Sequence, residues 1–331
     1  MASSTKLRVV VTGASGETWQ SIVRGLLAES SKFHVIALAR PESANNPAHQ
    51  DLARAGATVE TADFLDVQAL AERLAGADVV ISCILPIKRA QSEALIDAAH
   101  SARVGRFVLS FFAMVMPPRG VMAVRDLREE LLDRCKLVYL PYTVIDVGQW
   151  YQIGLPPPWA PPMPQTEAFV GGGETPSAMI DKDDVGRYVA RIITDPRTLN
   201  RSVFAYGEVT SQKTILAELK AATGREVPWH SISVAGLEAR LAELRSSLAA
   251  DPTSPKTTLD LAMTQYLYSR MVRGDNAPDR AQYLGYLDAK TLYPDFEFKS
   301  LRHYIKEVVA GDRDHRVYVG REITSGETKK Y

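Results

Sequence analysis

The segment Val9-Val10-Val11-Thr12-Gly13-Ala14-Ser15-Gly16-Glu17-Thr18-Trp19 decides the fold of this 331-residue chain. The β-branched run that leads into Gly13 is typical of a strand buried on both faces of a parallel sheet. Apolar residues recur at helical spacing after Trp19, so a helix is predicted to follow the turn. Strand, tight turn and helix together predict the first unit of a doubly wound α/β sheet.

The turn between this strand and helix predicts a dinucleotide site. Gly13 permits the sharp turn, Gly16 lets the backbone approach a diphosphate, and the helix N-terminus offers free N–H groups. Trp19 replaces the third glycine of the usual fingerprint, so its ring must point away from the sheet or push the helix outward. A plain loop between buried elements is the alternative interpretation. The predicted coenzyme-binding residues of the turn are Gly13, Ser15, Gly16, Glu17, Thr18 and Trp19.

Strand-like and helix-like segments alternate through the first half of the chain. This alternation predicts a Rossmann-type doubly wound parallel sheet, whose ligands lie at the carboxyl ends of the strands. The predicted strands are 33–38, 57–60, 78–84, 106–111 and 143–147, with helical spacing over 67–74, 94–99 and 121–135. The side chains at the strand ends are further coenzyme candidates: Arg40, Asp63, Phe64, Ser82, Ile84, Leu85, Lys88, Ser110 and Phe111.

Arg40 indicates which dinucleotide binds. It follows the second predicted strand, where a dinucleotide fold places the group that meets the adenosine ribose. An acid there favours NAD, whereas an arginine can bind a 2′-phosphate through two hydrogen bonds, so NADP(H) is the predicted coenzyme. Glu42 can also reach a ribose hydroxyl, and a solvent-facing Arg40 is the alternative. Phe64 is expected near the adenine, with a core position as its rival interpretation.

The second half of the chain has a different character. Proline lacks an N–H and fixes φ, so the proline-rich stretch 155–164 is predicted to be an extended surface segment that forms a wall or lid. Helical spacing over 184–195, 211–223 and 234–248 and a strand at 203–206 follow. We predict an NADP-binding domain at 1–153, to which 181–207 returns, and a smaller, mostly helical substrate-binding domain at 154–180 and 208–331.

The composition limits the kinds of binding partner that are expected. The chain is 46% hydrophobic and 24% charged, and its 39 basic and 39 acidic residues give a formal net charge of +0. Neither nucleic acid nor an anionic membrane is therefore expected as a partner, and no apolar run reaches transmembrane length. The short polar start before the first strand predicts no signal peptide and therefore a cytoplasmic protein. A monomer or homodimer is expected. Cys83 and Cys135 lack metal-ligand spacing, so no metal is expected and both thiols are predicted to be reduced packing residues.

Four segments in order resemble the NmrA-like and isoflavone reductase-like branch of the atypical short-chain dehydrogenases/reductases. They are 11–16 (VTGASG), 106–110 (RFVLS), 140–148 (LPYTVIDVG) and 184–200 (DVGRYVARIITDPRTLN). The resemblance implies an NADP-binding Rossmann domain, a small C-terminal substrate domain and, among reductases, hydride delivery to activated double bonds of small aromatic metabolites. It equally implies a non-catalytic NAD(P)-binding redox sensor or transcriptional regulator that binds a partner protein.

One departure from the family concerns proton transfer. Reductase members carry a lysine on the helix after the fifth strand, but residues 121–130 contain none, and Arg128 or Arg125 falls at that position. Arginine stays protonated, so it can polarise a carbonyl but cannot shuttle a proton. Asp126 and Lys88 are further catalytic candidates, although both are equally explained as solvated side chains. Tyr286 and Lys290 have the spacing of ordinary short-chain dehydrogenases but lie outside the expected helix. The six histidines form no constellation with a nucleophile and an acid.

Bulky side chains at the strand exits predict an apolar pocket. The predicted substrate-binding residues are Phe112, Met114, Trp150, Tyr151 and Trp159, each of which alone is also explained as core. The leading hypothesis is an NADPH-dependent oxidoreductase that acts on a C=C, C=N or carbonyl group of a bulky apolar secondary metabolite. Ring closure of the substrate inside the pocket is a variant of this reaction. A sensor needs no deep apolar cavity, so the presence of one separates the two hypotheses.

Overall fold

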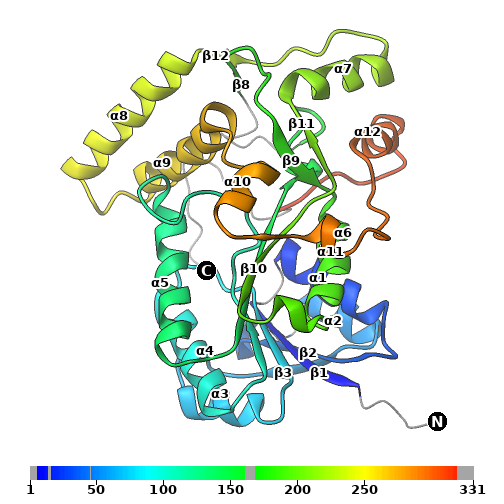
Figure 1. The fold of residues 1–331 in the computed structure, drawn as a ribbon, viewed down its shortest axis with the longest axis vertical. Coiled ribbons are helices and arrows are strands. Elements are labelled where there is room, and N and C mark those ends of the chain that lie inside the picture. Colours follow the sequence, from blue (N-terminus) through cyan, green and yellow to red (C-terminus); the bar gives the residue numbers. More distant parts are fainter. Residues whose placement is uncertain (1–5, 14–15, 45, 161–167, 319–331) are drawn as a thin grey trace.

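The computed structural model of the protein describes residues 6–13, 16–44, 46–160 and 168–318. Its centre is a sheet of eight parallel strands in the order β13-β10-β6-β5-β4-β1-β2-β3 (Figure 1). The order reverses between β1 and β4, which confirms the Rossmann-type doubly wound prediction. The strands are β1 (Leu7–Thr12), β2 (Phe33–Ala39), β3 (Thr58–Thr61), β4 (Val79–Ser82), β5 (Arg106–Val108), β6 (Tyr142–Val147), β10 (Arg201–Ala205) and β13 (Leu287–Asp288).

Helices cover both faces of the sheet because its strands are apolar on both sides (Figure 1). Successive residues of β1 point to opposite faces: Val9 and Val11 pack with α1 and α6, and Val10 packs with α3 and α4. The helices of these layers are α1 (Glu17–Leu27), α2 (Pro47–Arg54), α3 (Val67–Leu74), α4 (Arg89–Ser101), α5 (Ala123–Leu137) and α6 (Lys182–Ile192).

Two glycines bring α1 and α6 into backbone contact. A Cβ on Gly25 would overlap the Gly186 backbone, and a Cβ on Gly186 would overlap the carbonyl oxygen of Ser21. The Ser21 hydroxyl donates to Lys182 O at 2.6 Å and accepts the Gly186 N–H at 3.1 Å. Residues far apart in the chain therefore fix the position of α1, and with it the glycine turn that precedes α1.

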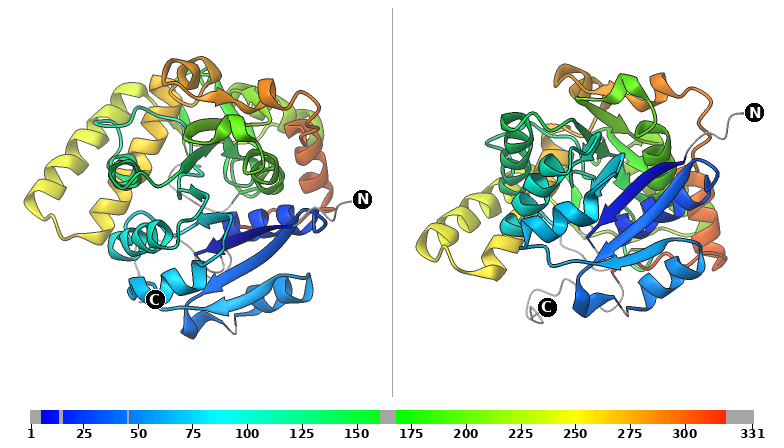
Figure 2. Two further views of the ribbon diagram at one scale, coloured as in Figure 1. Left: turned by 60° about the horizontal axis from the view of Figure 1, so that its bottom comes forward. Right: turned by 90° about the horizontal axis from the view of Figure 1, so that it is seen from below.

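Most of the remaining elements lie beyond one end of the large sheet, and α8 and α9 project to one side (Figures 1 and 2), whereas α10 and α11 pack against the edge strand β13. Gly224, with φ 71°, closes α7 as its sequence position predicts. The helices are α7 (Gln212–Thr223), α8 (Val234–Ala250), α9 (Pro255–Tyr268), α10 (Pro278–Tyr283), α11 (Ala289–Leu292) and α12 (Leu301–Ala310). Two small sheets combine β7 (Gln149–Trp150), β9 (Ser177–Ile180) and β11 (Glu208–Thr210), and β8 (Phe169–Val170) with β12 (Ser231–Ile232).

The start of the proline-rich segment differs from its prediction. Pro157 and Pro158 are exposed, but Leu155, Trp159 and Ala160 are buried with Tyr151 and Tyr304 in a separate core, so only part of 155–160 lies at the surface. The apolar side chains between the prolines outweigh the surface preference of proline itself. Residues 161–164 of that stretch lie outside the described residues.

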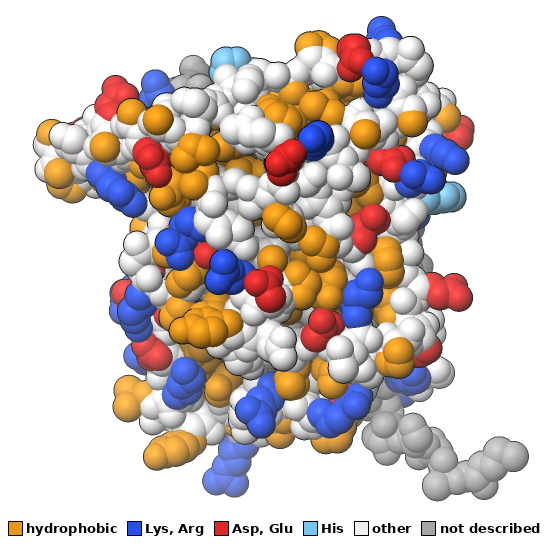
Figure 3. Space-filling view, turned by 45° about the horizontal axis from the view of Figure 1, so that its top comes forward, with side chains coloured by type: hydrophobic (Ala, Val, Ile, Leu, Met, Phe, Trp, Pro, Cys, Tyr) orange, Lys and Arg blue, Asp and Glu red, His pale blue; other side chains and the backbone are white. Residues whose placement is uncertain are grey.

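Charges of both signs are interspersed with apolar side chains on the face shown in Figure 3. None of the helices in the described ranges has the length and apolar character needed to cross a membrane.

Candidate active site

Gly13 and Gly16 are the described ends of the glycine turn after β1. Gly13 has φ 101°, and a Cβ there would lie 2.5 Å from the carbonyl carbon of Cys83, so the turn passes directly over the end of β4. Gly16 caps α1 without a side-chain hydrogen bond, and a Cβ on it would meet only Gly13 O at 3.9 Å. Open space therefore faces the unpaired N–H groups of α1, and these residues fit a coenzyme diphosphate. Ser15 lies outside the described residues.

The first turn of α1 also contacts the last described part of the chain. Glu17 accepts a hydrogen bond from Lys182 Nζ at 2.5 Å and another from the Tyr318 backbone N–H at 3.3 Å. The Tyr318 ring stacks on Trp150, with ring centroids 6.3 Å apart. Glu17 thus joins α1 to α6 and to the C-terminal segment, whereas its neighbour Thr18 lines a cavity.

The candidates on the adenosine side surround the ends of β2 and β3. Arg40 is exposed directly after β2, and its Nη1 lies 2.9 Å from Glu42 Oε1. Asp63 Oδ1 accepts the N–H of Leu65 at 2.9 Å. The Phe64 ring is buried in the core cluster on the α3 side of the sheet, as its rival interpretation requires.

Three candidates at the end of β4 or just after it lie in different environments. Ser82 is buried, and its hydroxyl accepts the N–H of Ile84 at 3.4 Å. Ile84 packs against the core on the α3 side. Lys88 is the N-cap residue of α4, its side chain is exposed, and it does not line the cavity. This placement favours the interpretation of Lys88 as a solvated side chain.

A cavity of about 700 Å³ lies at the carboxyl ends of β4, β5 and β6, opposite α9. Adenosine is expected near Arg40, so this half of the switch point faces the other end of a dinucleotide. Strand exits contribute Cys83, Leu85, Ser110, Phe111, Phe112, Met114, Gly148 and Trp150 to its wall, and Thr18, Arg128 and Tyr318 also line it. Its far wall comes from α9, with Leu259, Ala262, Met263, Tyr266 and Leu267.

Arg128 is the arginine that faces the cavity. It is 8% exposed, its Nε donates to Ser110 O at 3.2 Å, and its Nη1 donates to the Tyr266 hydroxyl at 3.3 Å. The guanidinium therefore connects the end of β5 to α9 across an otherwise apolar wall. A fixed cation at this point can polarise a carbonyl oxygen in the cavity.

Arg125, one helical turn earlier, is occupied by a buried network and does not line the cavity. It donates to Asp146 Oδ2 at 2.6 Å, to Glu129 Oε1 at 2.7 Å and to the Tyr286 hydroxyl at 2.7 Å, and Tyr286 in turn donates to Asp146 at 2.6 Å. Burial alone would lower the pKa of Arg125, but Asp146, Tyr286 and Glu129 together raise it. The expectation that Arg125 is catalytic is therefore replaced by a structural role.

The Tyr286 and Lys290 pair is structural as well. Burial and the nearby Asp146 raise the pKa of Tyr286, and Lys290 Nζ donates to Gly207 O at 2.8 Å. Neither side chain lines the cavity. The dehydrogenase-like spacing of the two residues is therefore coincidental.

Several other candidates lie away from the cavity. Trp19 is fully buried against β1, with its indole Nε1 3.5 Å from Val11 O and its ring edge-on to His49, so the ring neither points away from the sheet nor lines the pocket. Tyr151 donates to Glu208 at 3.0 Å within the core that also contains Trp159. Asp126 lies on α5 outside the cavity, and its Oδ1 is buried without a hydrogen-bond partner among the described residues.

Sequence reasoning missed α9 and Tyr318. The α9 signal was present, because Ser254 precedes Pro255 as a helix start and Leu259, Ala262, Met263 and Tyr266 recur at helical spacing. The polar sequence around Tyr318 contains neither a helix-start signal nor a periodic apolar pattern that would place this residue at the cavity.

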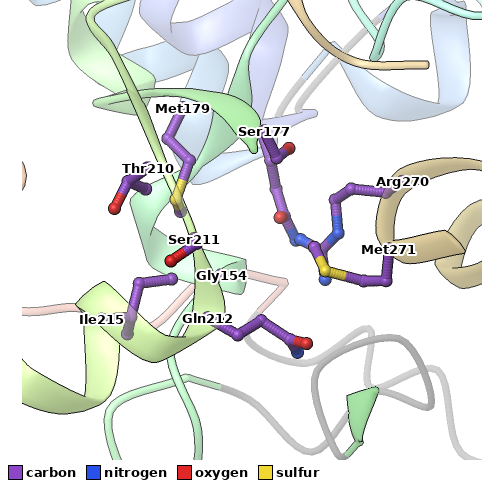
Figure 4. Close-up of a pocket in the computed structure, with 10 residues that line it drawn as sticks. Gly154, Ser177, Met179, Thr210, Ser211, Gln212, Ile215, Arg270 and Met271 are labelled. Atoms are coloured by element: carbon purple, nitrogen blue, oxygen red, sulfur yellow. The ribbon is translucent and has the colours of Figure 1, made fainter. Parts of the chain in front are cut away.

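A second hollow of about 10 Å³ lies between β9, β11, α7 and the short helical segment Ser269–Arg273 (Figure 4). Arg270 and Met271 extend into it opposite Thr210 and Ser211. Burial lowers the pKa of Arg270, yet its guanidinium remains protonated at neutral pH. The hollow has room for about one water molecule, so it is no ligand site of its own.

Comparison with known proteins identifies the family. A family model described as NmrA-like matches residues 5–120. Over 324 residues the chain is 37% identical to asnovolin J 5′,6′-dehydrogenase of Aspergillus novofumigatus, with 94% of this chain and 98% of that protein covered. The chain belongs to the NmrA-like family. An isoflavone reductase homolog of Zea mays is 25% identical to this chain over 319 residues, with 92% of this chain and 98% of that protein covered.

A solved structure shows the same fold. The binary complex of leucoanthocyanidin reductase with NADPH from Vitis vinifera superimposes on this NmrA-like protein with a TM-score of 0.75 at 19% identity, and the match covers 92% of this chain and 99% of that one. Because the match covers nearly all of both chains, the sheet and the helical C-terminal part together share the fold of that reductase.

Proposed function

We propose that the protein is an NADP(H)-dependent oxidoreductase that acts on a conjugated C=C, C=N or carbonyl group of a bulky apolar secondary metabolite. The observation that carries this proposal is the large apolar cavity next to the ends of β4, β5 and β6. A relative that is 37% identical to this chain is named a dehydrogenase, which supports a redox reaction. A non-catalytic sensor would have no use for such a cavity. Cytoplasmic location and a monomeric or homodimeric state stay predictions.

The residues of the site have separable tasks in this proposal. Gly13 and Gly16 leave room for the diphosphate, Arg40 binds the 2′-phosphate, and the aromatic wall of Phe111, Phe112 and Trp150 holds the substrate and excludes water. NADPH, when bound, supplies a hydride to an electrophilic carbon of that substrate. Arg128 stabilises the negative charge that then develops on a substrate oxygen or nitrogen.

Two measurements test the proposal. Calorimetry with NADPH is expected to show saturable binding, and a panel of terpenoid, polyketide and phenolic ketones is then screened for NADPH oxidation at about 340 nm. Mass spectrometry of the product shows whether two hydrogens have been added, and NMR separates simple reduction from reduction with ring closure, because these two products have the same mass. NADPH binding without turnover on any class of metabolite would favour the sensor, and no NADPH binding would refute both functions.

Arg40→Ala is expected to weaken NADPH binding about tenfold to hundredfold, because hydrogen bonds to a charged phosphate contribute about 1.5–3 kcal/mol. Binding of NADH, which has no 2′-phosphate, should change less than about threefold. The exposed Arg40–Glu42 pair contributes little to folding, so the variant should stay folded. Arg54→Ala removes an exposed arginine of α2 that also forms a surface ion pair, and it serves as the control. Equal losses for both coenzymes would contradict the assignment of Arg40.

Met263→Trp is expected to reduce turnover of a bulky substrate at least about tenfold while NADPH affinity stays within about twofold. Met263 lies on the α9 wall, away from the glycine turn, so an indole there fills substrate space only. Steady-state kinetics combined with calorimetry separates the two effects. Parallel loss of coenzyme and substrate binding would mean that the cavity is not divided in this way.

A further inference from the structure

A phenol faces the cavity directly beside the arginine that stands in place of the family's lysine. Tyr266 lies on α9, lines the cavity and accepts the hydrogen bond from Arg128 Nη1 at 3.3 Å. Arg128 is anchored at its other side by Ser110 O, just beyond β5. The Tyr266 hydroxyl is thereby held over the strand ends, although its own helix comes from the opposite wall.

We propose that Tyr266 donates and accepts the proton of the reaction and that Arg128 is the residue that positions it. Arg128 cannot release its own proton at neutral pH, whereas a phenol can. The hydrogen bond from Arg128 occupies a lone pair of the Tyr266 oxygen, so the phenol proton is free to point toward a substrate in the cavity. This proposal rests on the proposed redox function. In it, Tyr266 takes the role of proton donor, because the helix that carries a lysine in the family's reductases has none here.

In both directions of the reaction, Tyr266 exchanges one proton with the substrate and the coenzyme exchanges one hydride. In reduction of a conjugated ketone, the hydride forms a C–H bond at the β-carbon, and the C=C electron pair moves toward the carbonyl and leaves negative charge on its oxygen. The Tyr266 O–H bond breaks and its proton joins that oxygen, which leaves a tyrosinate beside Arg128. Water restores the proton, since Tyr266 is only partly buried. In the reverse direction, the tyrosinate accepts the proton as the hydride leaves for NADP⁺.

The other phenols near the cavity fit this task less well. Tyr318 also lines the cavity, but burial and the carboxylate of Glu17 raise its pKa and disfavour its anion. Tyr286 is committed to Asp146 and Arg125 outside the cavity. Among the tyrosines that line the described part of the cavity wall, Tyr266 accepts a hydrogen bond from a cation, Arg128.

Tyr266→Phe is expected to lower kcat at least about a hundredfold, because loss of a general acid typically costs 10²–10⁴ in rate. The Kd for NADPH should stay within about twofold, and the dependence of kcat on the protonation state of the acid should disappear from the pH profile. Tyr268→Phe is the matched control, since that hydroxyl lies two residues further on α9 and donates to Glu238 at 3.3 Å outside the cavity. A Tyr266→Phe enzyme with kcat within about threefold of the wild type would overturn the proposal.

A binding measurement without coenzyme or turnover keeps this test separate from that of the redox function. The probe is 2-naphthol, a flat apolar phenol whose fluorescence distinguishes its neutral form from its anion. The wild type should bind the naphtholate at least about tenfold more tightly than Tyr266→Phe or Arg128→Gln, with Arg128→Lys in between and Tyr268→Phe unchanged. Equal affinity in all folded variants, or no saturable binding by the wild type, would overturn the proton-transfer pair. Failure of NADPH to bind would instead refute the redox function.

Discussion

Asp146→Ala is expected to lower the free energy of unfolding by about 3–5 kcal/mol, the usual cost of removing one partner from a buried ion pair. Asp146 is fully buried on β6, and one of its oxygens accepts hydrogen bonds from both Arg125 and Tyr286. Its loss leaves the Arg125 cation, with a side chain 5% exposed, with Glu129 as its remaining carboxylate partner. Urea unfolding followed by circular dichroism measures the change.

An exposed ion pair provides the control for Asp146. Arg119→Ala breaks a pair with Asp133 in which both side chains are more than half exposed, so the expected change is below about 1 kcal/mol. A similar small change for Asp146→Ala would mean that the buried network contributes no more than a surface pair. Because Tyr286 directly precedes β13, we also expect that edge strand to lose protection from hydrogen exchange first in the Asp146 variant.

Gly186→Ala is expected to lower the free energy of unfolding by about 3 kcal/mol and to weaken NADPH binding at the same time. The added methyl group would overlap the carbonyl oxygen of Ser21, which belongs to the backbone of α1 and cannot rotate away. The two helices must separate, and the turn that precedes α1 then shifts relative to β4. Thermal unfolding and calorimetry with NADPH measure the two effects.

Gly172→Ala is the control for Gly186→Ala. A Cβ on Gly172 meets no atom closer than 3.9 Å, so neither stability nor coenzyme affinity should change measurably. If Gly186→Ala proved as mild as this variant, α1 and α6 would have enough freedom to move apart, and the close contact would have no energetic importance.

The sheet was predictable from sequence because its interior strands are apolar on both faces. Val9, Val10 and Val11 leave little alternative to a buried strand, and the same holds for residues 79–82 of β4. The edge strand β13 has only two residues, Leu287 and Asp288, and is held by pairing with β10 rather than by a pattern of its own. Such a strand has no signal that a single sequence reveals.

The site was predictable where it follows from topology and was missed where it depends on the direction of a side chain. Phe111, Phe112 and Trp150 line the cavity because they leave the sheet at its carboxyl end. Arg125 and Arg128 are three residues apart on one helix, and the sequence could not tell which of them meets Asp146 and which faces the cavity. Trp150 and its neighbour Tyr151 likewise enter different clusters, since adjacent side chains point in different directions.

The order in which the strands occur along the chain has a consequence for biosynthesis. The first 150 residues provide strands β1 to β6 of the large sheet, but β10 and β13 join that sheet only from residues 201–205 and 287–288. While the ribosome is still making the second half, β6 is therefore an open edge, and the opposite wall of the cavity has not been synthesised. A nascent chain can complete neither its sheet nor its cavity until nearly the whole polypeptide has emerged. Until then the unpaired edge of β6 is exposed and can bind chaperones or other chains.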